Sequence, residues 1–294
     1  MYLKQFGKSR SNLLKYLPFV LGFLGFMGAN LLAAKLMGVS ANSVLEDKIA
    51  VHGKNRTLFE ILSPFVFYLA LLLLIWRFYH NYSVRSLTTS RPRVDWNRVF
   101  FSFFLWIGVN VLFIGLMMLL HPNDFHFQFN WASFLILFVL SMVLIPIQTS
   151  FEEYFFRGYL MQFVAFLSKN RGVALMFTSV IFGLLHMGNP EVDDFGVVLM
   201  LYYIGSGFFL GIMTLMDEGL ELALGFHAAN NIVGALFVTS NSVVFQTDAL
   251  FLYTGSSTIY ELLMQVFVVF PILLWIFSRK YSWKSWKKNL FKSL

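Results

Sequence analysis

Long unbroken runs of apolar side chains are the feature that most restricts what this 294-residue chain can form. A helix needs about 20 predominantly apolar residues to cross a bilayer, whereas the strands of a membrane barrel alternate polar and apolar residues over about ten. Runs of the helical kind predict transmembrane segments near residues 16–38, 57–79, 99–120, 130–150, 172–187, 196–215, 219–238 and 258–278. The predicted fold is therefore all-α, a polytopic membrane helical bundle of about eight transmembrane helices.

The composition excludes most other classes of protein. Hydrophobic residues make up 58% of the chain, charged residues make up 13%, and the mean hydropathy is +0.69. These values lie outside the range of soluble globular or disordered chains. Because the chain has no cysteine, disulfides, thiolate metal ligands and cysteine nucleophiles are excluded. With no internal repeat and no linker of domain size, residues 1–294 are expected to form a single integral membrane domain.

Lysine and arginine side chains occur between alternate spans. They precede the first span, where they include Lys8 and Arg10, lie between the second and third, and follow the fourth and the last. Of the intervening segments, 121–129, 188–195 and 239–257 contain none, and only the first one, between the first and second spans, has any, with Lys48, Lys54 and Arg56. By the positive-inside rule both termini are expected in the cytoplasm. The basic, tryptophan-containing tail is expected to lie in the membrane interface, and no nucleic-acid partner is expected.

Ionisable residues at membrane depth are the best indicators of function in so apolar a chain, because each costs about 2.5–3.5 kcal/mol at a helix centre. They occur in three segments, which begin at Glu152, Phe182 and His227. The first reads Glu-Glu-Tyr-Phe-Phe-Arg, the second Phe-Gly-Leu-Leu-His and the third His-Ala-Ala-Asn-Asn. These residues are candidates for one polar site inside the bundle.

Spacing within the segments predicts which side chains meet. Glu153 and Arg157 are four residues apart, so they share a helical face and can form an ion pair that orients the carboxylate. Glu152 then points about 100° away from that face. His227 and Asn231 have the same four-residue spacing and present two polar groups to one point.

A helical hairpin is expected to bring the first two segments together. If residues 168–172 form its turn, Glu153 and His186 both lie roughly 25 Å along their helices, at the same level. His227 lies roughly 12 Å into its own span. A common site then requires the turn to project into the cytoplasm, and we expect a cavity among the fourth to seventh spans that opens on that side.

The motifs Glu-Glu-x-x-x-Arg, Phe-x-x-x-His and His-x-x-x-Asn, in this order on successive spans, resemble those of the CPBP intramembrane proteases. That family contains the CAAX prenyl endopeptidases and the bacterial Abi, or bacteriocin-immunity, proteins. The resemblance covers residues 130–240, which would be the catalytic core helices. It implies an endopeptidase in the bacterial plasma membrane that cleaves a membrane-anchored or membrane-proximal peptide. It also implies that Glu153 and Arg157 hold the catalytic helix in place.

The resemblance implies a role for each remaining motif residue. Glu152 would be the general base that activates water, and His186 would position that water. His227 and Asn231 would donate hydrogen bonds to the oxyanion of the tetrahedral intermediate. These roles agree with physical chemistry, because a poorly solvated carboxylate is a stronger base and preorganised donors stabilise developing charge in a low-dielectric site.

A zinc mechanism is the main alternative within this class. Glu152, His186 and His227 have the composition of a two-histidine, one-carboxylate zinc site with a position open for water. We favour the direct glutamate mechanism because the chain contains no His-Glu-x-x-His motif. Acyl-enzyme chemistry is not expected, since neither a cysteine nor a Gly-x-Ser-x-Gly motif is present.

Two further classes of function use the same residues. Buried Glu-Arg and His-Asn pairs can simply connect helices in a non-catalytic scaffold or immunity protein, and a transporter can use such groups as a proton relay. Outside the motifs, Gln148 and Asn110 are interpreted as interhelical hydrogen-bonding residues, with a place in the lining of the cavity as the alternative. Five further acidic residues are interpreted as solvated loop or helix-end charges: Asp193, Asp194, Asp217, Glu218 and Glu221.

Overall fold

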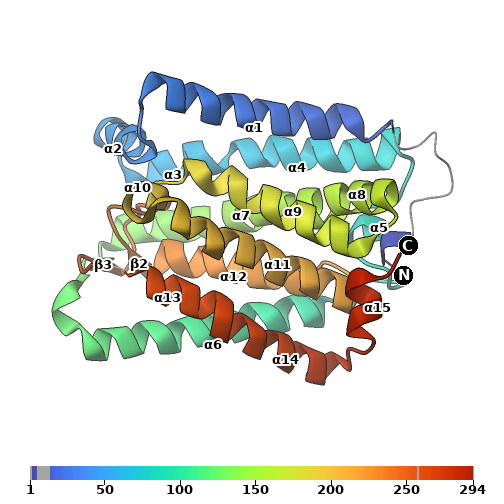
Figure 1. Ribbon diagram of the computed structural model, residues 1–294. Coiled ribbons are helices and arrows are strands. Elements are labelled where there is room, and N and C mark those ends of the chain that lie inside the picture. The colour runs from blue at the N-terminus through green and yellow to red at the C-terminus, as the bar shows by residue number, and fades with distance from the viewer. Residues whose placement is uncertain (1, 5–13, 257, 294) are drawn as a thin grey trace.

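Seven helical segments of the computed structural model are long and apolar enough to cross a membrane, within residues 2–4, 14–256 and 258–293 that the structure describes. They are Leu17–Met37, Lys54–Tyr79, Trp96–Leu120, Trp131–Ser168, Arg171–Gly188, Glu191–Asp217 and Ile259–Tyr281. Figure 1 shows them packed side by side with their axes roughly parallel. The protein is therefore an all-α, multi-pass membrane bundle, as predicted. Lys8 and Arg10, which contributed to the predicted orientation, lie outside the described residues.

The first half of the chain forms the outer helices. These are α1 (Leu17–Met37), α2 (Ala41–His52), α3 (Lys54–Leu62), α4 (Pro64–Leu74), α5 (Val84–Thr88) and α6 (Trp96–Leu120). The second half begins with α7 (Trp131–Glu153), α8 (Met161–Ser168), α9 (Arg171–Leu185), α10 (Glu191–Phe195) and α11 (Met200–Asp217). It ends with α12 (Glu221–Leu236), α13 (Ile259–Met264), α14 (Phe270–Tyr281) and α15 (Trp286–Phe291). Three short strands, β1 (Phe125–Phe127), β2 (Val238–Thr239) and β3 (Phe251–Tyr253), form one sheet in the order β1-β3-β2.

The eighth expected span, residues 219–238, is the central helix α12. Its 16 residues fall short of the roughly 20 that a full crossing needs. Twelve of them are buried, and α12 packs against α6, α7 and α11. In the 25-residue α6, by contrast, only Ser102 and Trp106 are buried. Because other helices surround α12, it contacts protein along its length and does not have to match the thickness of the bilayer.

One long helical segment carries the first motif. It runs from Trp131 to Ser168 as α7, a π-helical stretch (Tyr154–Leu160) and α8, and Pro146 lies inside α7 without ending it. The turn that follows has Lys169 in the left-handed region at φ 56°, and the Asn170 side chain then caps α9. The predicted hairpin is therefore confirmed.

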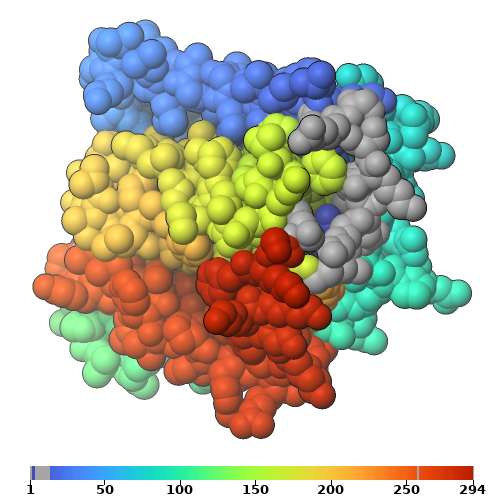
Figure 2. All heavy atoms as spheres, turned by 45° about the vertical axis from the view of Figure 1, so that its right-hand side comes forward, coloured from blue at the N-terminus to red at the C-terminus, as the bar shows by residue number. Residues whose placement is uncertain are grey.

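The connecting segments gather at two ends of the bundle (Figure 1). Helix α5, the α8–α9 turn and α15 lie at one end, which we call the basic end. Helices α2 and α10 and the small sheet lie at the other, which we call the sheet end. Figure 2 brings the basic end forward and shows the C-terminal segment, α14 and α15, on its surface. The basic segments thus share one end, as the alternating pattern predicts.

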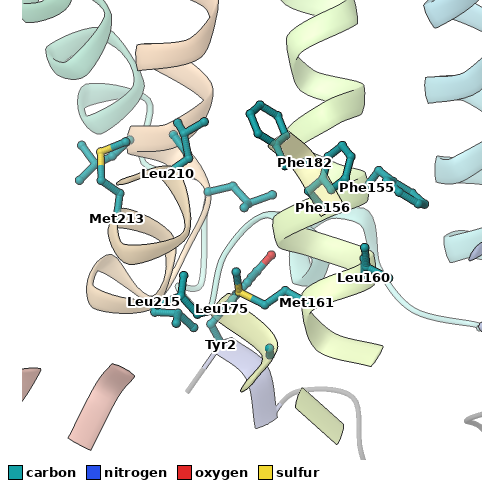
Figure 3. Close-up of a cluster of buried hydrophobic side chains, with 14 of the residues drawn as sticks. Tyr2, Phe155, Phe156, Leu160, Met161, Leu175, Phe182, Leu210, Met213 and Leu215 are labelled. Atoms are coloured by element: carbon teal, nitrogen blue, oxygen red, sulfur yellow. The ribbon is translucent and has the colours of Figure 1, made fainter. Parts of the chain in front are cut away.

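Close helix packing places the second motif beside α11. A Cβ on Gly183 of α9 would lie 2.4 Å from the Ile204 side chain, and one on Gly207 of α11 would lie 2.8 Å from the Ser179 carbonyl oxygen. Only glycine permits this approach. Figure 3 shows part of the buried hydrophobic core, in which the Phe156 and Phe182 rings meet edge to face with their centroids 5.2 Å apart. The end of α9 is therefore held firmly against its neighbours.

Two acidic residues interpreted as solvated charges are buried, so that interpretation is wrong for them. Asp217 is 4% exposed and Glu221 is 0% exposed. Arg91 reaches Asp217 Oδ2 at 2.9 Å and Glu221 Oε2 at 3.1 Å, and Arg98 also pairs with Asp217. We call these four residues the basic-end network. The sequence places the acids at helix ends but does not show that two distant arginines cover them.

Candidate active site

Four of the six predicted site residues line one cavity of about 510 Å³ inside the bundle. Glu152 comes from α7, His186 follows α9, and His227 and Asn231 come from α12. The other two, Glu153 and Arg157, lie next to this cavity and are completely buried. The structure therefore brings together all three segments that the sequence singled out.

The predicted ion pair is present and fully enclosed. Arg157 Nη1 donates to Glu153 Oε1 at 3.0 Å, and Nη2 donates to the Gly207 carbonyl oxygen at 3.3 Å. The guanidinium group also lies 4.2 Å from the centre of the Phe182 ring. These contacts connect the π-helical stretch to both α9 and α11. The buried carboxylate is thereby neutralised, as its burial requires.

Glu153 has a second contact that the spacing did not predict. Its Oε1 lies 2.7 Å from His227 Nδ1. Because a carboxylate paired with an arginine is ionised and only accepts hydrogen bonds, Nδ1 must carry the proton. The other ring nitrogen, Nε2, lies 3.6 Å from Glu152 Oε2. Glu153 thus orients the His227 ring so that Nε2 lies close to the Glu152 carboxylate.

Glu152 differs from its neighbour in exposure and in partners. Its side chain is 12% exposed and that of Glu153 is 0% exposed, as expected for adjacent residues that face different directions. Glu152 Oε2 is buried and accepts no hydrogen bond from any described residue. One oxygen of this carboxylate is therefore available to a molecule in the cavity.

The other oxygen of Glu152 ends a chain of hydrogen bonds. Gln148 Nε2 donates to Glu152 Oε1, and Asn231 Nδ2 donates to Gln148 Oε1 at 3.0 Å. Behind them, Asn230 Nδ2 donates to Asn231 Oδ1 at 3.1 Å, and Trp106 Nε1 donates to Asn230 Oδ1 at 3.1 Å. All four donors point toward the carboxylate. This chain of hydrogen bonds therefore runs from α6 through α12 to Glu152 and orients its side chain.

Two of these residues, Gln148 and Asn230, contribute more to the site than their sequence positions indicated. Gln148 does make an interhelical bond, as interpreted, but it also lines the cavity. Its position four residues before Glu152, on the same helical face, was the available signal. Asn230 gave no comparable signal, because its role depends on the Trp106 indole of a distant helix.

His186 lies in the turn that ends α9. Its Nδ1 is 2.7 Å from the Phe182 carbonyl oxygen, an acceptor, so Nδ1 carries the proton and Nε2 of the neutral ring is an acceptor. The ring stacks on Tyr203 with centroids 4.5 Å apart and packs against Phe182 at the same centroid distance. This histidine is therefore fixed in orientation and can accept a hydrogen bond inside the cavity.

The comparisons with known proteins agree with the motifs. Residues 131–233 match the family described as type II CAAX prenyl endopeptidase Rce1-like. The chain is also 32% identical over 211 residues to the uncharacterized protein YyaK of Bacillus subtilis (strain 168), which covers 70% of this chain and 71% of that protein. The chain belongs to the CPBP family. No solved structure gives a significant match to it.

The matched segment of this CPBP protein runs from the start of α7 into α12. It therefore contains all six predicted site residues, together with Gln148 and Asn230. The N-terminal helices lie outside it, although Trp106 of α6 reaches the site through Asn230. These helices contribute to the site by packing rather than through a motif.

The cavity of this CPBP protein runs in the direction opposite to the one expected. We expected it to open on the side of the 168–172 turn, but it is lined by Asn189, Glu191, Val244 and Glu261, which belong to the sheet end. Helical rise predicts that residues lie at the same level of the bundle, but it does not show which end of the bundle is closed by other segments. Here α8, α15 and the basic-end network occupy the basic end, so the expected direction is wrong.

The zinc alternative has no preformed ligand set in this CPBP protein. Among the described residues, no three His, Cys, Asp or Glu side chains lie close enough together to hold a metal ion. The Nδ1 bonds of His227 to Glu153 and of His186 to a backbone carbonyl group do not bear on this point, because metal-ligating histidines make the same bonds. The arrangement of Glu152, His186 and His227 does not fit a metal ion, so no step is derived through one.

Proposed function

We propose that this protein is an intramembrane endopeptidase in which Glu152 is the general base. Membership of the CPBP family supports the reaction class. The observation that carries the proposal is the Glu152 carboxylate, which lines the cavity and has one oxygen held by Gln148 and the other without a donor among the described residues. A general base needs an accessible lone pair within reach of the proton that it removes.

The proposed reaction begins with water bound between the Glu152 carboxylate and His186 Nε2. Glu152 takes a proton as the water oxygen attacks the peptide carbonyl carbon. In the proposed reactive form His227 carries a proton on both ring nitrogens, so that Nδ1 donates to Glu153 and Nε2 is also a donor. The resulting oxyanion accepts hydrogen bonds from this Nε2 and from the second N–H of Asn231 Nδ2. Glu152 then transfers its proton to the amide nitrogen, the C–N bond breaks, and the two peptide products leave.

The proposed substrate is a peptide segment anchored in or lying close to the bilayer, and the proposed location is a bacterial plasma membrane. A cavity of about 510 Å³ accommodates a few residues of an extended chain. Its apolar lining includes Phe65, Leu199 and Leu210, which favours a hydrophobic segment. The proposal names no requirement for a prenyl group.

Cleavage of a peptide library by the purified protein tests this proposal. Wild type and Glu152→Gln are reconstituted in lipid vesicles and mixed with fluorogenic membrane-proximal peptides. The variant should lose roughly 10²–10⁴-fold in kcat, because it lacks a general base. Glu46→Gln, the same change at an exposed carboxylate on α2, should cleave at the wild-type rate.

Thermal unfolding of each preparation shows whether the protein is folded. Cleavage that persists in Glu152→Gln would remove this residue from its proposed role. A folded wild type that cleaves no member of a broad library would overturn the endopeptidase proposal.

A further inference from the structure

Glu191 is a second cavity carboxylate that the proposed reaction does not use. It is the first residue of α10 and lines the cavity near the sheet end. Its Oε1 accepts a hydrogen bond from the backbone N–H of Val244 at 3.0 Å. Its Oε2 is buried and has no hydrogen-bond partner among the described residues. This carboxylate therefore has the same half-satisfied arrangement as Glu152.

Glu191 lies close to the proposed reaction centre. The Tyr203 hydroxyl lies beside the Glu191 carboxylate and also accepts a hydrogen bond from Asn189 Nδ2 at 3.0 Å. The Tyr203 ring stacks on the His186 ring, with centroids 4.5 Å apart. A single aromatic side chain thus separates Glu191 from the histidine proposed to position water.

The charge of the cavity is unbalanced. Of the described residues that line it, three are glutamates, Glu152, Glu191 and Glu261, and none is lysine or arginine. A buried carboxylate is costly unless a cation or several donors satisfy it. Glu153 has such a partner in Arg157, whereas no described lysine or arginine forms a salt bridge with Glu191.

We propose that Glu191 forms a subsite for a cationic nitrogen of the peptide substrate, positioned close to the scissile bond. The group is a lysine or arginine side chain or a free α-amino group. This inference rests on the proposed function and names a substrate class for it: a hydrophobic, membrane-proximal segment that carries one positive charge near the cleavage point. Ion pairing with the unpartnered Oε2 selects that charge.

Binding to an inactive variant tests the subsite without requiring cleavage. Glu152→Gln is reconstituted in phosphatidylcholine vesicles and titrated with fluorescent, acetylated leucine-alanine peptides in which one lysine is moved along the sequence. Each peptide has a norleucine counterpart of similar shape. At one position lysine should bind roughly 10- to 100-fold more tightly than norleucine. Peptides with norleucine and a free amino terminus test the α-amino source separately.

Adding Glu191→Gln to this variant should abolish the preference, because glutamine still accepts the Val244 N–H bond but carries no charge. Asp193→Asn is the matched control, since Asp193 is on the same short helix but is exposed and does not line the cavity. It should retain the preference. The ratio of the dissociation constants of the lysine and norleucine peptides is measured within one preparation of each variant. A change in the folded fraction therefore cancels in that ratio.

The outcomes separate this inference from the proposed function. Equal binding of lysine, free-amine and norleucine peptides, or a preference that survives Glu191→Gln, overturns the subsite. A Glu191-dependent preference supports it even if the wild type cleaves none of these peptides, a result that counts against the endopeptidase alone. Cleavage of cationic and neutral peptides at the same rate, with equal binding, retains the endopeptidase and removes the subsite.

Discussion

The basic-end network and a second group of buried residues, the central cluster, contain the same kinds of side chain but differ in how completely their carboxylates are paired. The basic-end network, Arg91 and Arg98 with Asp217 and Glu221, matches two buried acids with two arginines. We define the central cluster as Glu152, Glu153, Arg157 and His227. It has two carboxylates but one arginine, and its second carboxylate faces a cavity.

The difference distinguishes structural from chemical use of buried charge. In the basic-end network both Asp217 oxygens are bonded, and the Trp283 indole adds a third donor at 3.1 Å. In the central cluster Glu152 retains an oxygen without a donor. An incompletely satisfied buried carboxylate lowers stability, and natural proteins retain such groups mainly at functional sites. We therefore expect variants of the two regions to affect different measurements.

The largest loss of stability is expected from Arg157→Met. This change leaves Glu153 completely buried without its cation, which should lower the free energy of unfolding by about 3–5 kcal/mol. The double variant Arg157→Met with Glu153→Gln should regain most of that loss, because no unpaired charge is left behind. Denaturant unfolding in mixed micelles measures both variants. Wild-type stability in the single variant would show that Glu153 does not depend on the arginine.

A smaller loss is expected at the basic end. Asp217→Asn weakens charge-assisted bonds to Arg91, Arg98 and Trp283, which should cost about 1.5–3 kcal/mol of unfolding free energy. Cleavage per folded molecule should not change, because these groups lie outside the cavity. Asp95→Asn is the control, since that partner of Arg98 is 34% exposed and should matter by less than about 1 kcal/mol. A fall in kcat for Asp217→Asn would contradict the separation of the two regions.

The comparison also shows what the sequence could predict. Hydrophobic runs located the seven spanning segments of the described residues and the central helix α12, because crossing or filling a bilayer demands apolar length. Four-residue spacing predicted the Glu153–Arg157 pair, because both partners are on one helix. The Glu153–His227 contact and the Arg91 and Arg98 pairs join residues more than 70 positions apart. Local spacing contains no information about such contacts.

The direction of the cavity illustrates the same limit. Helical rise gives the distance of a residue from a turn along the helix axis. That distance does not show at which end of the bundle the cavity opens. Which end is open depends on how α8, α15 and the small sheet pack. Glu191 was overlooked for a related reason: it follows Asn189 and Pro190 in what reads as a loop, and its burial depends on Val244.

A moderate effect on turnover is expected from Gln148→Leu. Removing the amide deletes the donor to Glu152 Oε1 and interrupts the chain from Trp106, so the carboxylate is less well oriented. We expect kcat to fall roughly tenfold with KM near the wild-type value. The free energy of unfolding should fall by about 1–3 kcal/mol, because Glu152 Oε1 and Asn231 Nδ2 lose their partner. Asn110→Leu is the matched control, because that amide bonds only to the Trp106 carbonyl group of its own helix. A rise in KM with kcat unchanged would assign Gln148 to substrate binding instead of positioning.

The smallest effect is expected from removing metal ions. If zinc bound Glu152, His186 and His227, the carboxylate would be a ligand, and the contrast between a saturated network and an available base would disappear. The absence of a three-residue ligand group among the described side chains favours an available base. Extensive dialysis of the reconstituted protein against a zinc chelator should therefore leave kcat and KM unchanged. Activity that disappears with the chelator and returns with zinc would show that Glu152 acts as a metal ligand, and that both clusters use their carboxylates to hold a cation.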